Sequence, residues 1–166
     1  MKITLDPLSL KSWDKAIQQL DDYAKSLDRK AVELCERLAD MGAMYAEWNF
    51  GGVMYAGDID YNITVVRGEG NTYLIQVAGE TVLFMEFGAG IHYGGGHPMQ
   101  SEFGMGPGTY NPSSTNWSNP SGWWFYQGSI GQSIHTYGNP AGMPVYNAAK
   151  DLRKEIRDVA REVFKT

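Results

Sequence analysis

The residues best suited to acid–base or metal chemistry are one carboxylate and two histidines. Glu86 lies in an apolar run, and His92 and His97 follow it in a glycine-rich segment. A carboxylate beside two imidazoles could bind a metal ion or act as a general acid and base. However, the histidine spacing fits no zinc pattern, and the single cysteine, Cys35, lies far away in the sequence. We therefore expect no metal, no cofactor and no catalytic residue, with Glu86 forming a salt bridge or accepting backbone N–H hydrogen bonds.

Two other motifs are similar to functional signatures but lack an essential residue. Ser129 lies in Gln-Gly-Ser-Ile-Gly, where a nucleophile elbow requires glycine at the position of Gln127. Gly88 and Gly90 begin a dinucleotide-like pattern, but the third glycine is displaced to Gly94 and no helix is expected to follow. The sequence also contains no Walker loop.

A run of four aromatic residues, Trp123 to Tyr126, is the strongest candidate for a contact surface. In a strand, Trp123 and Phe125 share one face and Trp124 and Tyr126 the other. One pair should enter the core, and exposed aromatics on the other face tend to mark an interface. Stacking on sugars or bases is the alternative use of these rings.

Composition and charge exclude several classes of protein. The chain has 166 residues, a formal net charge of −5 and no Lys or Arg between Arg67 and Lys150. Such an acidic middle makes a poor nucleic-acid surface, which needs clustered cations. One cysteine allows no disulfide within the chain. The first residues contain no apolar signal region, and no apolar stretch is long enough for a transmembrane helix, so we expect a soluble, cytoplasmically made product.

The hydrophobic pattern predicts a single α+β domain over residues 1–166. Residues 1–50 should be mainly helical, either unbroken or interrupted near residues 26–28. Residues 53–87 alternate and turn like an antiparallel β-meander, with its third strand at 81–87, and residues 122–128 should form a further strand. Residues 144–165 have an apolar stripe behind Pro144 and should form the last helix. We thus expect a sheet of about four strands packed against long N-terminal and C-terminal helices.

The segment 88–121 is predicted to be a long loop rich in glycine and aromatic residues. Loops of this length are uncommon in compact domains and are usually functional or disordered. This one contains large apolar side chains such as Tyr93, Phe103 and Tyr110, which a free disordered linker would lack. We therefore expect it to become ordered against a partner, most economically against neighbouring copies of the same chain.

Several segments in this order resemble a family of proteins from long-tailed bacteriophages. The run Phe84-Met-Glu-Phe-Gly-Ala-Gly-Ile91 is similar to the Val-Glu-Phe-Gly-Thr-Gly-Ile signature of siphophage tail-completion and head–tail joining proteins. Residues 104–109, 122–124 and 139–148 also resemble segments of members from phages of Gram-positive hosts. The resemblance extends over residues 82–164.

This resemblance implies a non-enzymatic structural subunit of the virion, located at the head–tail junction or the top of the tail. Such subunits form rings, commonly six-fold, that contact neck, head-completion or tail-tube proteins. Packaged DNA would at most pass through the channel, and no membrane is involved. We expect the loop and residues 139–147 to supply the ring contacts. The candidate interface residues are Glu86, Phe87, Gly88, Gly90, Tyr93, Phe103, Met105, Tyr110, Trp123, Trp124, Met143 and Tyr146.

Two other classes of function remain open at this point. The chain could be a phage-associated hydrolase of cell wall or polysaccharide, with Glu86, His92 and His97 as catalytic groups and the tryptophans holding sugar. It could also be a small binding module that uses Trp123 and Trp124. Within the phage interpretation, neck joining and tail termination remain alternatives.

Overall fold

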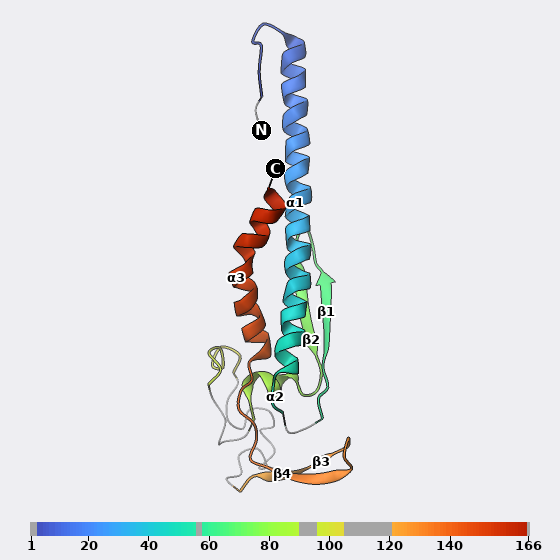
Figure 1. The fold of residues 1–166 in the computed structure, drawn as a ribbon, viewed down its shortest axis with the longest axis vertical. Helices are drawn as coiled ribbons and strands as arrows, with labels where there is room; N and C mark the ends of the chain where they lie inside the picture. Colours follow the sequence, from blue (N-terminus) through green and yellow to red (C-terminus); the bar gives the residue numbers. More distant parts are fainter. Residues whose placement is uncertain (1–2, 56–57, 90–95, 105–120, 166) are drawn as a thin grey trace.

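The computed structural model describes residues 3–55, 58–89, 96–104 and 121–165. The elements in chain order are α1 (Leu10–Gly51), β1 (Asn62–Arg67), β2 (Tyr73–Ala78), α2 (Val82–Phe87), β3 (Trp123–Gln127), β4 (Gln132–Thr136) and α3 (Pro144–Phe164). Helix α1 forms the long axis of the molecule, and α3 lies beside its C-terminal half (Figure 1). The predicted α+β class is confirmed, with long helices near both ends of the chain.

Helix α1 is unbroken over its 42 residues, so the interruption considered near residues 26–28 is absent. Ser9 caps its N-terminus, because its hydroxyl accepts the backbone N–H of Ser12 at 3.4 Å. No glycine or proline occurs between Leu10 and Met41, so nothing in this stretch opposes helix formation. The helix ends at the Gly51–Gly52 pair, as expected.

Helix α3 begins at Pro144, as predicted, and runs antiparallel to α1. Its C-terminal end lies beside Lys30, whose ammonium group is 3.5 Å from the Lys165 carbonyl oxygen. At 1.5 Å per residue the 21 residues of α3 span about 31 Å, whereas α1 spans about 63 Å. Helix α3 therefore covers only the C-terminal half of α1.

The densest part of the core lies where the end of α1 meets α2 and the β1–β2 hairpin. Phe50 and Met85 are fully buried, and Val82 packs with them. The Phe50 ring stacks on Tyr61 with centroids 4.6 Å apart. Residues from β1 and β2, including Ile63 and Val77, complete this cluster.

The third strand expected at residues 81–87 is wrong, because Val82–Phe87 forms the short helix α2. A short apolar run does not by periodicity alone distinguish a buried strand from a buried helix. Here Val82, Met85, Glu86 and Phe87 are buried whereas Leu83 is exposed; Val82, Met85 and Glu86 have the spacing of one helical face. The Met85 N–H donates to the Thr81 carbonyl oxygen at 3.0 Å, closing the first helical turn.

The four-stranded meander is also wrong: the described residues contain two separate two-stranded antiparallel sheets. Strands β1 and β2 form the predicted hairpin, with Arg67 opposite Tyr73. Among the described residues, no third strand pairs with this hairpin. Strand β3 pairs instead with β4 (Trp123 opposite Thr136). Strand β4 escaped prediction because Ile134 is its only apolar residue.

The β3–β4 hairpin lies beyond the end of α1, at the opposite end of the molecule from the start of that helix (Figure 1). The Ser129 N–H in its turn is 3.3 Å from both carboxylate oxygens of Asp58. Hydrogen bonding from Ser129 lowers the pKa of Asp58 from its ordinary value. In the described ranges, neither long helix has an apolar stretch that could cross a membrane.

Candidate functional site

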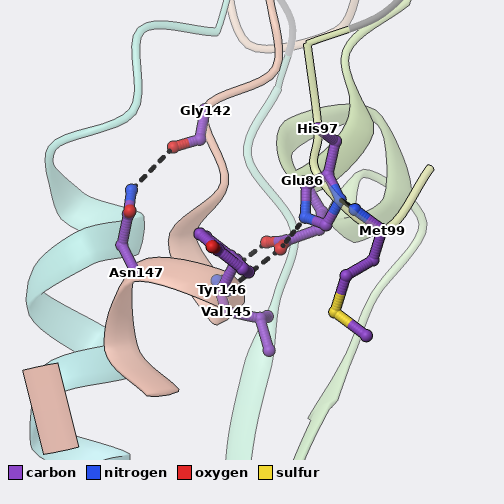
Figure 2. A network of polar contacts seen from close by, with 7 residues as sticks. All are labelled: Glu86, His97, Met99, Gly142, Val145, Tyr146 and Asn147. Carbon is purple, nitrogen blue, oxygen red and sulfur yellow. Dashed lines mark hydrogen bonds and ion pairs between the residues drawn. The ribbon is translucent and has the colours of Figure 1, made fainter. Parts of the chain in front are cut away.

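The carboxylate of Glu86 has three hydrogen-bonding partners in the described structure. It projects from α2 toward the start of α3, and the residue is 6% exposed. Its Oε2 accepts the Val145 N–H at 2.7 Å, and its Oε1 accepts the Tyr146 N–H at 3.0 Å. The same Oε1 lies 2.9 Å from Nε2 of His97 (Figure 2). Of the two roles expected for Glu86, acceptance of backbone N–H groups is present, and its contact with His97 is a salt bridge only when the imidazole is protonated.

Glu86 acts as the N-cap of α3 from another element. The first N–H groups of a helix have no partner within it and normally bond to the side chain of the preceding residue. Met143 holds that position here, has φ 54° and supplies no capping hydrogen bond. Pro144 has no N–H, and Glu86 accepts those of Val145 and Tyr146. The positive end of the helix dipole also favours a carboxylate at this place.

The hydrogen bonds of His97 define its tautomer. The Met99 N–H donates to Nδ1 of His97 at 3.1 Å, so Nδ1 carries no proton. The proton of a neutral imidazole then lies on Nε2, which donates to Glu86. The His97 side chain is 2% exposed. Both ring nitrogens are therefore engaged, and neither presents a free lone pair to a metal or substrate.

A backbone clasp holds α2 against the segment that leads into α3. Ala89 and Asn139 exchange two backbone hydrogen bonds of 2.8 and 3.0 Å. The Asn139 side chain donates to the Phe84 carbonyl oxygen at 2.9 Å. Between these contacts Gly88 has φ 76°, and a Cβ there would lie 2.7 Å from the backbone nitrogen of Ala141. Only glycine fits this conformation and this approach.

Aromatic rings surround the Glu86–His97 pair. The ring of Phe87 lies 4.4 Å from that of His97 and 5.9 Å from that of Phe103, and Tyr146 meets His97 edge-on. An apolar hollow of about 400 Å³ lies beside them, between α2, residues 97–103 and α3. Lys150 and Arg153 line the α3 side of this hollow. The rest of the lining is mainly apolar.

The structure brings together about half of the candidate interface residues. Glu86, Phe87 and Gly88 are buried in contacts within the chain, whereas Met143 and Tyr146 are half-buried at the start of α3. Phe103 adjoins them through Phe87 and is 56% exposed. Four other candidates lie outside the described residues, and so does His92. These are Gly90, Tyr93, Met105 and Tyr110.

Trp123 and Trp124 lie on β3, away from the Glu86 cluster. The predicted alternation is present: Trp123 and Phe125 are half-buried, whereas Trp124 and Tyr126 are each 69% exposed. Neither pair is fully buried, so the expectation that one pair enters the core is wrong. Trp124 packs edge-on against His135 of β4, with centroids 5.1 Å apart.

Two residues organise this site in ways that the sequence did not predict: Asn139 was not among the candidates, and Met143 was expected only as an interface residue. Asn139 is 7% exposed and ties α2 to the α3 approach through its amide, and Met143 makes the left-handed turn that aims α3 at Glu86. An Asn-Pro pair before a proline-initiated helix was the available signal for the first. Methionine gives no signal for a left-handed conformation.

The hydrogen bonds of this arrangement join α2 to the start of α3. Among the described residues, no three His, Cys, Asp or Glu side chains are grouped so that they could hold a metal ion. The turn residue Ser129 bonds to Asp58 through its N–H and is not paired with a histidine in the described hydrogen bonds. Comparison of the chain with family models, with curated proteins and with solved structures found no match.

Proposed function

We propose that this chain is a non-enzymatic structural subunit of a tailed bacteriophage virion that assembles with copies of itself into a ring. Its place would be the head–tail junction or the top of the tail, as a neck-joining or tail-terminator subunit. The family resemblance of residues 82–164 supports the phage assignment, and the distribution of apolar surface supports self-assembly.

The observation that carries the proposal is how much large apolar surface stays uncovered. Only Phe50, Met85 and Pro144 are fully buried large side chains among the described residues. By contrast, Leu10, Trp48, Met54, Leu74 and Trp124 are each more than half exposed. Monomeric soluble proteins expose apolar residues singly, whereas repeated exposure of large ones marks contact surfaces. These surfaces lie on different elements, as a subunit with several neighbours requires.

The chemistry of the Glu86 cluster supports a structural role. Its carboxylate, which would be the acid or base of a hydrolase, already accepts three hydrogen bonds. A general acid or base must reach a substrate proton. The residues of the phage-like signature instead join α2 to α3, and they hold the apolar hollow and Phe103 in a fixed position for a neighbour.

The acidic middle of the chain is compatible with a channel lining. Residues 68–149 contain no Lys or Arg, so such a wall would not bind phosphates through counterion release. Copies related by a single rotation axis use two different surfaces, which close into a ring when the rotation divides a full turn.

Purified full-length protein examined by negative-stain electron microscopy and light scattering tests the assembly. We expect rings, or monomers that convert to rings as concentration rises. In the phage that encodes the chain, removal of the gene should leave filled heads separate from tails, or tails of abnormal length. Normally joined particles from the deletion would overturn the proposal, and turnover of cell-wall polysaccharide that His97→Ala abolishes would favour the hydrolase.

A further inference from the structure

The N-terminal half of α1 carries an apolar stripe that stays largely exposed, although residues 3–9 fold back beside its start, where the Trp13 Nε1–H donates to the Pro7 carbonyl oxygen at 3.3 Å. Helix α3 ends beside Lys30, so the residues before it extend beyond the body of the molecule (Figure 1). The stripe consists of side chains that are 37–83% exposed, namely Leu10, Trp13, Ile17, Leu20 and Leu27, with Ala24 between the last two.

The spacing of this stripe is that of a coiled coil. From Leu10 to Leu38 the apolar positions alternate by three and four residues without a break: 10, 13, 17, 20, 24, 27, 31, 34 and 38. This average of 3.5 residues favours a helix wrapped along a second helix. The last three positions, from Ala31 onward, are half-buried beside α3. The exposed stripe thus continues a helix–helix interface that the fold already uses.

The flanking charges define the direction of a partner helix. An aspartate directly follows Trp13, Leu20 and Leu27, forming a row of Asp14, Asp21 and Asp28 along one edge of the stripe. Two antiparallel copies would place these rows opposite each other, and like charges at such positions repel. In a parallel pair, the aspartate row of each copy would instead face the opposite edge of the partner's stripe. Tyr23 of one copy would then lie beside Asp28 of the other.

We infer that residues 10–27 of α1 are a self-association surface, occupied by the same segment of a second copy in parallel orientation. The inference goes beyond the proposed function and does not rest on it. A two-helix contact of this kind uses the same surface on both copies, so it is separate from the two different surfaces that close a ring. With about 27 Å of helix available, the contact is short and association should depend on concentration.

The first test compares two adjacent substitutions in the full-length chain, Leu20→Asp in the stripe and Gln19→Asp beside it. Both residues are exposed, both variants add one negative charge, and circular dichroism should show the same helix content. In sedimentation velocity over a wide concentration range, Leu20→Asp should raise the dissociation constant at least about tenfold, and Gln19→Asp should behave like the parent. A parent that stays monomeric, or equal effects of the two variants, would overturn the inference.

The second test measures direction by cross-linking in a Cys35→Ala background. Parallel copies bring the two Leu10 positions together, so Leu10→Cys should form disulfide-linked dimers on mild oxidation, whereas Lys15→Cys on the opposite side of the helix should not. Association without the Leu10→Cys cross-link would contradict the parallel arrangement. A Leu20→Asp variant that self-associates as tightly as the parent would sink this inference and leave the proposed virion function standing.

Discussion

At the scale of single residues, a carboxylate that resembles a catalytic group completes a helix from a distance. Glu86 and the N–H groups it accepts are nearly sixty residues apart in the chain. The negative charge matters, because all three of its partners donate and none accepts. Its hydrogen bonds therefore hold α2 against α3.

We predict that Glu86→Gln lowers the free energy of unfolding by about 2 kcal/mol. The amide has the same shape, but it replaces one acceptor oxygen with an NH₂ group that would face another donor. The N-terminus of α3 would also lose a compensating negative charge. Urea unfolding of this variant and of Glu69→Gln, an exposed turn residue, measures the difference. Equal stabilities of the two variants would contradict the capping role.

Alanine substitutions at Gly88 and Gly70 separate the cost of a positive φ from the cost of a steric clash. Gly88→Ala must adopt φ 76° and place its Cβ 2.7–2.8 Å from the backbone of residues 139–141. Gly70→Ala must adopt φ 63° but meets nothing within 4 Å. We expect Gly70→Ala to cost about 1 kcal/mol and Gly88→Ala at least about twice that. Thermal unfolding of both variants gives the comparison, and similar melting temperatures would show that the clasp can open without cost.

At the scale of elements, α1 is the support on which both α3 and the β1–β2 hairpin rest. Gly42 lies where all three meet: a Cβ there would clash with Cδ1 of Ile75 and lie 3.1 Å from Cδ2 of Leu152. A glycine in the middle of a long helix costs helix propensity, and here it leaves room for side chains of both neighbouring elements at one position.

We predict that Gly42→Leu destabilises the protein by about 2 kcal/mol, because the added side chain displaces Ile75 and Leu152 and outweighs the gain in helix propensity. Gly51→Leu, at the end of the same helix with open space around it, should be nearly neutral. Chemical denaturation of the two variants distinguishes packing from propensity. A stabilised Gly42→Leu would mean that the hairpin is not held against α1.

The elements that could be predicted from the sequence are those whose pattern repeats. The long helices α1 and α3, the β1–β2 hairpin and the aromatic strand β3 follow from apolar spacing, caps and turn residues. Residues 81–87 are too few for their apolar spacing to distinguish a helix from a strand. Their helix is determined by the burial of Val82 and Met85 against Phe50. Strand β4 forms because it can pair with β3. Its own residues, such as Gln132 and Ser133, do not indicate a strand.

The candidate site was predictable in part, for a similar reason. Glu86 could be expected to bond to a backbone or a charged group, because an isolated carboxylate in an apolar run must be satisfied. Its actual partners, Val145, Tyr146 and His97, depend on how α2 and α3 meet. Whether the remaining candidates form an interface is a property of the assembly, which a single chain does not display.

At the scale of the whole molecule, we predict that exposed aromatic residues contribute to assembly and little to stability. Trp124 is 69% exposed and Phe103 is 56% exposed, so Phe103→Ser combined with Trp124→Ser should change the melting temperature slightly while preventing ring formation. Ile59→Ser, just before β1 and 53% exposed, is the control and should still assemble. Light scattering and electron microscopy give the readout, and intact rings from the double variant would remove these two residues from the interface.

The pairing of α1 with α3 has a consequence for the order in which the protein folds. The two helices pack together, yet both hairpins and α2 lie between them in the chain, and contacts between distant segments form slowly. A capped helix as long as α1 can form within about a microsecond, well before α3 arrives. During that interval its whole apolar stripe is accessible to other chains. Refolding yield should therefore fall as protein concentration rises, with exchanged α3 helices as the characteristic by-product.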